Sequence, residues 1–180
     1  GFQPEYPEFK DLGVIHENVN LQELIFHIKN NFESSDWLIR FQAINECRSL
    51  YKSMPTKIND ILACFSCYLK RNLIECKTAT NKMTLIAISD FFEFANTYPI
   101  DLAFATEFLD LLIKKELNPH KLIRSSLQKC LENLIKNSGC ESLIQQLCEL
   151  SINRNKKIGY YGFNYLAMAL NNNKDSLHLL

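Results

Sequence analysis

The 180-residue sequence predicts an all-α protein, an α-solenoid in which helical hairpins follow one another along the chain. Only five glycines and five prolines are present, so few positions interrupt regular structure. Apolar residues recur at intervals of three and four over most of the length, and no segment shows the convincing alternation of a strand. The hairpins that this periodicity predicts also begin at a regular spacing.

The first twenty residues differ from the rest. Pro4 and Pro7 prevent a long helix there. The apolar side chains scattered through this segment include Phe2, Tyr6 and Phe9. We expect residues 1–20 to form an extended lead that packs on the first repeat; the alternative is that its apolar side chains bind a partner.

The first hairpin is predicted over residues 21–51. Its first helix has an apolar face formed by Leu21, Leu24, Ile25 and Ile28. A short turn follows, in which Ser34, Ser35 and Asp36 can cap a helix N-terminus. The second helix has a face formed by Trp37, Phe41, Ile44, Cys47 and Leu50.

The second hairpin is predicted between Pro55 and Phe94, with a polar stretch at residues 75–81 between its helices. Its first apolar face consists of Ile61, Leu62, Phe65, Tyr68 and Leu69. Its second consists of Met83, Ile86, Ala87, Phe91 and Phe94.

Two further hairpins complete the chain. The third joins a helix at residues 102–115 to one that runs from Ile123 towards a stop at Gly139, and the fourth joins residues 143–150 to residues 158–170. Hairpins therefore start near residues 21, 58, 102 and 140, a spacing of 37 to 44 residues that is typical of HEAT or armadillo-type repeats. We predict one repeat domain over residues 21–180 with about four helix pairs, each stabilised by its neighbour.

The same periodicity predicts the buried core. Its expected members are Leu24, Ile28, Phe41, Ile44, Phe65, Ile86, Phe91, Leu111, Ile123, Leu127, Leu131, Leu147 and Leu166.

Composition narrows the possible partners and the compartment. Twenty basic and twenty acidic residues cancel, so we expect neither nucleic acid nor a membrane surface as a partner. No apolar run approaches the ~18 residues of a membrane span. Seven cysteines, an odd number at helical spacing, indicate a reduced, cytoplasmic compartment. The chain begins with glycine, and we expect a segment of a longer protein that is monomeric as a domain.

Catalytic motifs are missing. The sequence has no glycine-rich phosphate loop, nucleophile elbow or zinc-binding helix, and its four histidines are scattered. We therefore expect no enzyme, no catalytic residue, no metal and no cofactor. Cys64 and Cys67 form a C-x-x-C pair inside a helical run; packing is the favoured interpretation, with metal or redox use as the alternative.

The turns within the hairpins share a composition. An aromatic residue stands in the first turn, and basic residues stand in or beside all four: Trp37 and Arg40, then Lys77 and Lys82, then Lys121 and Arg124, then Arg154, Lys156 and Lys157. In a solenoid such turns lie along one edge, which predicts an aromatic anchor followed by a basic row. The alternative is that Lys and Arg simply favour solvated turns.

These turns carry a family resemblance. Residues 35–44, followed by Arg48-Ser49-Leu50, resemble the opening repeat of TOG domains, the tubulin-binding HEAT arrays of the CLASP and crescerin families. Residues 77–82 are similar to the family's "Arg-Ser-Ser-Val-x-Arg" turn, and residues 109–124 with Cys130-Leu131 are similar to its third-repeat signature. Asn153-Arg154-Asn155 stands where the family has "His-Lys-Asn".

The match extends over roughly residues 21–170, with two departures. Gly159 stands where the family's fourth turn usually carries Arg, and four helix pairs are expected instead of six.

The resemblance implies a microtubule-associated, non-catalytic module that regulates microtubule dynamics or structure. Tubulin would bind to the edge of turns through Trp37, Arg40, Lys77, Lys82, Lys121, Arg124, Arg154, Lys156 and Lys157. Trp37 would be at least partly exposed, although a tryptophan folded back between helices is the competing arrangement. The implied location is the cytoplasm and cytoskeleton, with the cilium, basal body or centriole as candidates. The alternative function is a HEAT-like scaffold for a different protein.

Overall fold

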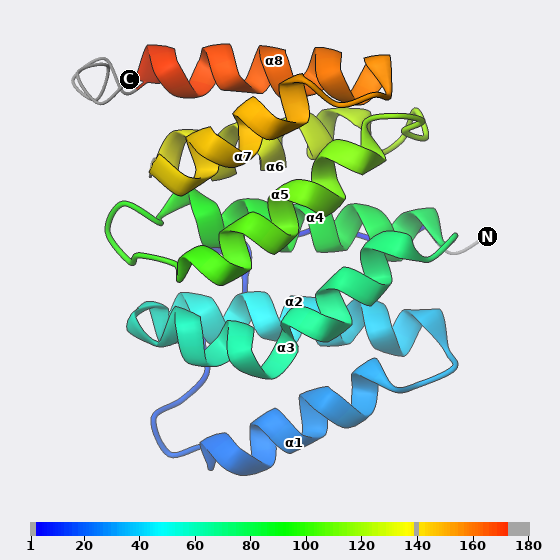
Figure 1. Ribbon diagram of the computed structural model, residues 1–180. Coiled ribbons are helices and arrows are strands. Elements are labelled where there is room, and N and C mark those ends of the chain that lie inside the picture. The colour runs from blue at the N-terminus through cyan, green and yellow to red at the C-terminus, as the bar shows by residue number, and fades with distance from the viewer. Residues whose placement is uncertain (1–2, 139–140, 173–180) are drawn as a thin grey trace. The chain divides into compact units, whose positions relative to one another are not determined.

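The computed structural model describes residues 3–138 and 141–172 (Figure 1). Every regular element in these two ranges is helical: η1 (Phe9–Asp11), α1 (Leu21–Phe32), α2 (Trp37–Ser53), η2 (Pro55–Lys57), α3 (Ile58–Ile74), α4 (Thr78–Glu93), α5 (Leu102–Lys115), α6 (Arg124–Asn137), α7 (Glu141–Ser151) and α8 (Lys156–Asn172). The predicted all-α class is confirmed. Phe2, the helix stop predicted at Gly139 and residues 173–180 of the predicted repeat domain lie outside the described residues.

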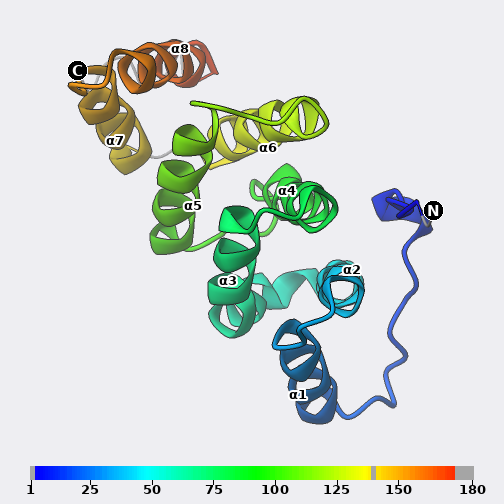
Figure 2. The same cartoon turned by 90° about the vertical axis from the view of Figure 1, so that its right-hand side faces the viewer.

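The chain forms two compact units, Gly1–Phe91 and Phe92–Leu180. In the first, α1 packs against α2, α2 packs against α3, and α1 also contacts α3. The turn between α1 and α2 and the turn between α3 and α4 lie at the same end of this unit, at the right of Figure 1 and towards the viewer in Figure 2. Side chains cap both helices: Asp36, one of the predicted caps, accepts from the Leu38 backbone N–H at 2.9 Å through Oδ1, and Asn20 Oδ1 accepts from that of Gln22 at 3.1 Å.

A buried arginine is the main polar feature of this first unit. Only 1% of Arg48 is exposed. Its Nε donates to Asp90 Oδ2 at 2.7 Å, its Nη1 to Asn45 Oδ1 at 3.0 Å, and its Nη2 to the Pro7 carbonyl at 2.8 Å. The guanidinium therefore connects α2 to α4 and to the segment before α1, and the hydrogen bonds compensate its desolvation.

In the second unit, α5 packs against α6, α7 and α8, and α7 and α8 form a close hairpin. A Cβ built at Gly162 would lie 2.8 Å from both Leu150 C and Ser151 N, so α8 crosses the end of α7 where only glycine fits. The Tyr165 hydroxyl donates to Glu116 Oε1 at 2.8 Å. Burial of the phenol, together with the neighbouring carboxylate, raises the pKa of Tyr165 well above its ordinary value.

Most of the expected core is buried. The exceptions are four predicted core residues that are only half-buried: Leu24, Ile86, Leu111 and Leu166. For three of them, the adjacent Leu85, Leu112 and Tyr165 are buried instead. Neighbouring helical positions differ by about 100° around the axis, so a run of apolar residues does not reveal which of two adjacent ones faces inwards.

Candidate interaction site

Trp37 is fixed by the start of α2. It is the first residue of that helix, after the Asp36 cap. Its ring packs edge-on against the buried ring of Phe41 one turn later, with centroids 6.2 Å apart. The indole is half-buried, so part of its surface remains open to solvent at the end of the unit where the two turns lie.

Lys77 comes from the other turn and covers the same indole. Its Nζ lies 4.1 Å from the centroid of the Trp37 ring, a cation–π distance. The aromatic residue of the first turn and a basic residue of the second, 40 positions apart in sequence, are therefore in direct contact.

Arg40 joins the two turns. Its Nη1 donates to the carbonyls of Ser34 and Ser35 at 2.7 and 3.1 Å, and its Nη2 donates to Glu75 Oε2 at 2.8 Å. The Arg40 side chain is only 14% exposed. Its charge is therefore paired with Glu75, and the Arg40 side chain links the α1–α2 turn to the α3–α4 turn.

The segment before α1 completes the site. Lys82 Nζ lies 4.5 Å from the centroid of the Tyr6 ring, and that ring packs edge-on against Phe41 at 5.6 Å. Burial raises the pKa of the Tyr6 hydroxyl. The sequence predicts that Tyr6 packs on the first repeat, with partner binding as the alternative, but nothing in it connects residue 6 with residue 82. We refer to Tyr6, Trp37, Phe41, Lys77 and Lys82 as the aromatic–lysine cluster.

The other predicted basic residues belong to the second unit. They are all exposed: Lys121 and Arg124 around the start of α6, and Arg154, Lys156 and Lys157 around the start of α8. Within that unit, the α5–α6 and α7–α8 turns lie at the same end, as Figures 1 and 2 show. The Asn155 side chain caps α8 by accepting from the Lys157 backbone N–H at 3.0 Å.

Gly159, where the resembled family usually has Arg, is buried beneath this turn. A Cβ built at this position would lie 3.0 Å from the Ser151 carbonyl oxygen. Because the contacted atom belongs to the backbone, any side chain at this position would require α7 and α8 to separate by a few tenths of an ångström, so close packing favours glycine here.

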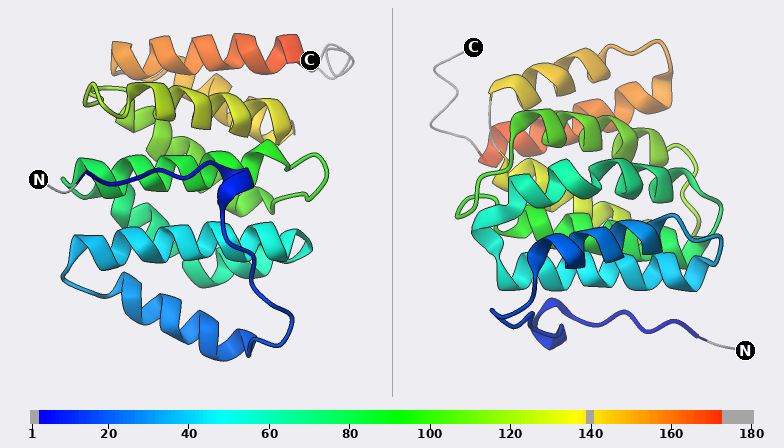
Figure 3. Two further views of the ribbon diagram at one scale, coloured as in Figure 1. Left: turned by 180° about the vertical axis from the view of Figure 1, so that it is seen from behind. Right: turned by 90° about the horizontal axis from the view of Figure 1, so that it is seen from below.

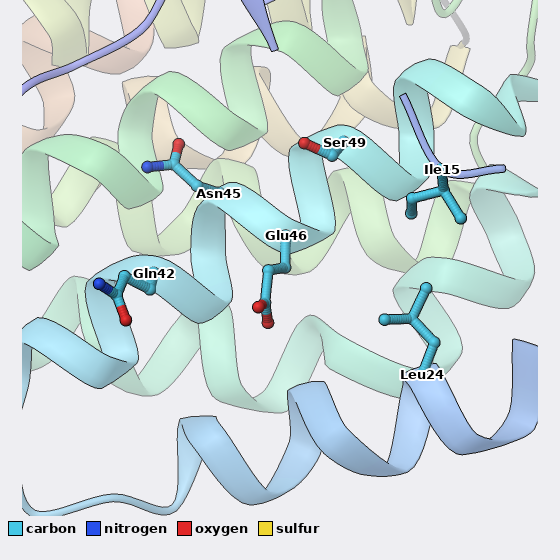
Figure 4. A pocket seen from close by; sticks show the side chains of 6 residues that line it. All are labelled: Ile15, Leu24, Gln42, Asn45, Glu46 and Ser49. Carbon is cyan, nitrogen blue, oxygen red and sulfur yellow. The ribbon is translucent and has the colours of Figure 1, made fainter. Parts of the chain in front are cut away.

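A separate open pocket of about 350 Å³ lies between α1, α2 and the preceding segment (Figure 4). Ile15 and Leu24 give it an apolar side, and its polar side is formed by Gln42, Asn45, Glu46 and Ser49. Beside it, His27 Nε2 lies 3.7 Å from Glu46 Oε1. The pocket offers hydrogen-bonding groups next to an apolar wall.

The structure also places the C-x-x-C pair and the other candidate metal ligands. Among the residues that the structure describes, no three His, Cys, Asp or Glu side chains are grouped to hold a metal ion. Cys64 is half-buried and Cys67 is exposed, both on α3, so the packing interpretation of this pair is wrong for Cys67.

None of the described helices combines the length and apolar character needed to cross a bilayer. Comparison of the chain with models of known protein families gives no match, and comparison with curated proteins also gives none.

Proposed function

We propose that this chain is a non-catalytic, microtubule-associated module that binds tubulin and regulates microtubule dynamics or structure. In this proposal its helix pairs form a TOG-like α-solenoid of the HEAT type, and tubulin docks on the ends where the turns lie. It acts in the cytoplasm at the cytoskeleton, with the cilium, basal body and centriole as candidate places.

The observation that carries the proposal is the Trp37–Lys77 stack. It lies on two turns whose sequences resemble the tubulin-contacting turns of TOG domains, and it puts an aromatic surface and a positive charge at one point. An indole that is half-buried can lose its remaining water against an apolar patch, while the adjacent cation favours an acidic surface. The exposed basic residues of the second unit would add long-range attraction to an acidic partner.

Co-elution with purified tubulin on gel filtration, at low and at moderate salt, tests the proposal. We expect binding that weakens as salt rises, because exposed charges are screened beyond a Debye length of ~8 Å at physiological ionic strength. Trp37→Ala should weaken binding by about 30-fold, the effect of losing a central anchor worth ~2 kcal/mol. Lys77→Gln should weaken it by about 2- to 5-fold, in line with an exposed cation–π contact.

Lys57→Gln provides the matched control. Lys57 is also exposed, but it lies in η2, between α2 and α3, at the end of the unit away from the α1–α2 and α3–α4 turns. The Lys57→Gln variant should bind tubulin as tightly as the unchanged chain does. Absence of co-elution at low salt, with helical circular dichroism intact, would remove the tubulin proposal.

The second candidate is a helical scaffold for a different protein, and α8 favours it. Tyr160 and Phe163 on this helix are each 64% exposed, which is unusual for large aromatic side chains. A scaffold that uses this surface would lose its partner in a Phe163→Ser variant and keep it in Trp37→Ala. The tubulin proposal predicts the opposite pattern for tubulin: Trp37→Ala should weaken tubulin binding, and Phe163→Ser should leave it unchanged.

A further inference from the structure

Residues 3–15, which we call the N-terminal strap, lie across the helices of the first unit. Seen from behind in Figure 3 (left), the chain passes over α4, turns at η1 and crosses α2 before it reaches α1. Its backbone–backbone hydrogen bonds are local, such as those from the Asp11 N–H to the Glu8 carbonyl and from the Leu12 N–H to the Phe9 carbonyl, whereas the Ile15 N–H donates to Ser53 Oγ of α2 at 2.9 Å.

Apolar side chains anchor the strap at every third position. Tyr6 packs against Phe41 at 5.6 Å, Phe9 packs against Tyr51 at 5.9 Å, and Leu12 is buried. Phe41 and Tyr51 both belong to α2, so this one helix supplies the aromatic surface for the first two anchors.

Long side chains of α2 hold the main chain of the strap between these anchors. Arg48 Nη2 donates to the Pro7 carbonyl at 2.8 Å. Lys52 Nζ donates to the carbonyls of Lys10 and Leu12 at 2.6 and 2.8 Å. This arrangement resembles the way proteins bind extended peptides. In such complexes, hydrogen bonds to the peptide main chain give affinity, and contacts with side chains at regular intervals give specificity.

The cations of the helices contact the main chain and one ring of the strap. Arg48 and Lys52 donate to its carbonyls, Lys82 lies over the Tyr6 ring, and the exposed Glu8 pairs with Lys10 within the strap at 3.0 Å. One of these cations, Lys82, is covered by the Tyr6 ring, and it is also one of the predicted tubulin contacts.

We propose that α2 and α4 form a docking surface for an extended peptide, that the strap is its displaceable occupant, and that another extended segment with apolar residues at every third position can replace it. Displacement uncovers Lys82 and removes Tyr6 from the aromatic–lysine cluster. The proposal rests on the strap contacts and stands whether or not the module binds tubulin.

A binding assay with a fluorescent synthetic peptide of residues 3–15 tests it on the full chain. In the unchanged chain the tethered strap competes at an effective concentration in the mM range, so added peptide should bind weakly. A Tyr6→Ala/Phe9→Ala chain keeps the helices and loses two strap anchors, so it should bind the peptide at least about tenfold more tightly as that competition weakens. A peptide of the same composition with its two aromatic residues placed side by side should not bind.

Val14→Ala is the matched control, since Val14 belongs to the strap but is 63% exposed. It should bind the peptide as weakly as the unchanged chain does. Equal peptide binding by all three chains would overturn the proposal.

Hydrogen exchange on the unchanged chain provides a test that needs no variant. Excess isotope-labelled peptide, distinguishable by mass, should accelerate exchange in residues 3–15 of the protein and leave α3 unaffected. If exchange in the strap does not respond to saturating peptide, the strap is a fixed part of the fold and the surface beneath it is not a binding site.

Discussion

Replacing Arg48 by Met tests whether the buried arginine is the main polar connection of the first unit. Methionine keeps much of the length and removes the charge. It also leaves the carboxylate of Asp90, whose side chain is 9% exposed, without its guanidinium partner. Loss of one member of a buried pair costs about 3–5 kcal/mol, a large share of the ~5–15 kcal/mol that stabilises a typical domain.

The measurement is urea unfolding followed by circular dichroism, with a double variant to isolate the charge. Arg48→Met/Asp90→Leu removes both ions, and apolar replacement of a whole buried pair is often nearly neutral. The double variant should therefore be more stable than Arg48→Met alone. Lys57→Met, which removes an exposed ion pair with Asp60 at 3.8 Å, should cost no more than about 1 kcal/mol. If Arg48→Met costs as little as Lys57→Met, or if Arg48→Met/Asp90→Leu is no more stable than Arg48→Met, the reasoning is wrong.

Two further predictions concern the second unit. Gly162→Ala should destabilise the protein by about 1–3 kcal/mol because the new methyl group meets the backbone of α7. Gly13→Ala, with nothing within 4 Å of the new methyl group, should be neutral or slightly stabilising. Thermal unfolding compares the two variants, and equal melting temperatures would contradict the close crossing of α7 and α8. Tyr165→Phe should cost about 1–3 kcal/mol at neutral pH by leaving Glu116 without its hydroxyl donor. Because folding raises the pKa of Tyr165, its stabilising effect is complete below the unfolded value of 10.0 and declines as pH rises beyond it. The difference in free energy of unfolding between the unchanged chain and Tyr165→Phe, measured in urea, should therefore narrow above pH 10. A constant difference would refute this.

Much of the fold could be predicted because it depends on local periodicity and punctuation. The predicted helix at residues 102–115 coincides with α5, and the cap predicted at Asp36 is present. The burial of Arg48 could not be predicted. Its partner Asp90 is 42 residues away, and a charged residue in an apolar stripe gives no signal of where its counter-ion lies.

The candidate site was predicted in part for the same reason. Trp37 and Lys77 were identified from their turns, but their contact depends on how two hairpins pack. The engagement of Arg40 by Glu75 and the position of Tyr6 over Lys82 also depend on tertiary packing. Sequence patterns identify which residue types occupy turns, and only the packed structure shows which charges are already paired.

The Trp37–Lys77 stack bears on the conformational entropy of binding. A free lysine or arginine that becomes ordered at an interface loses about 0.5–1.5 kcal/mol of rotamer freedom. Lys77 is already positioned on an indole that the start of α2 fixes, so it has less freedom to lose, whereas exposed side chains such as Lys121 and Arg154 would have to be ordered by the partner. Any ligand of both units would therefore gain more net affinity per charge from the first unit, even though the described part of the second unit carries more exposed cations.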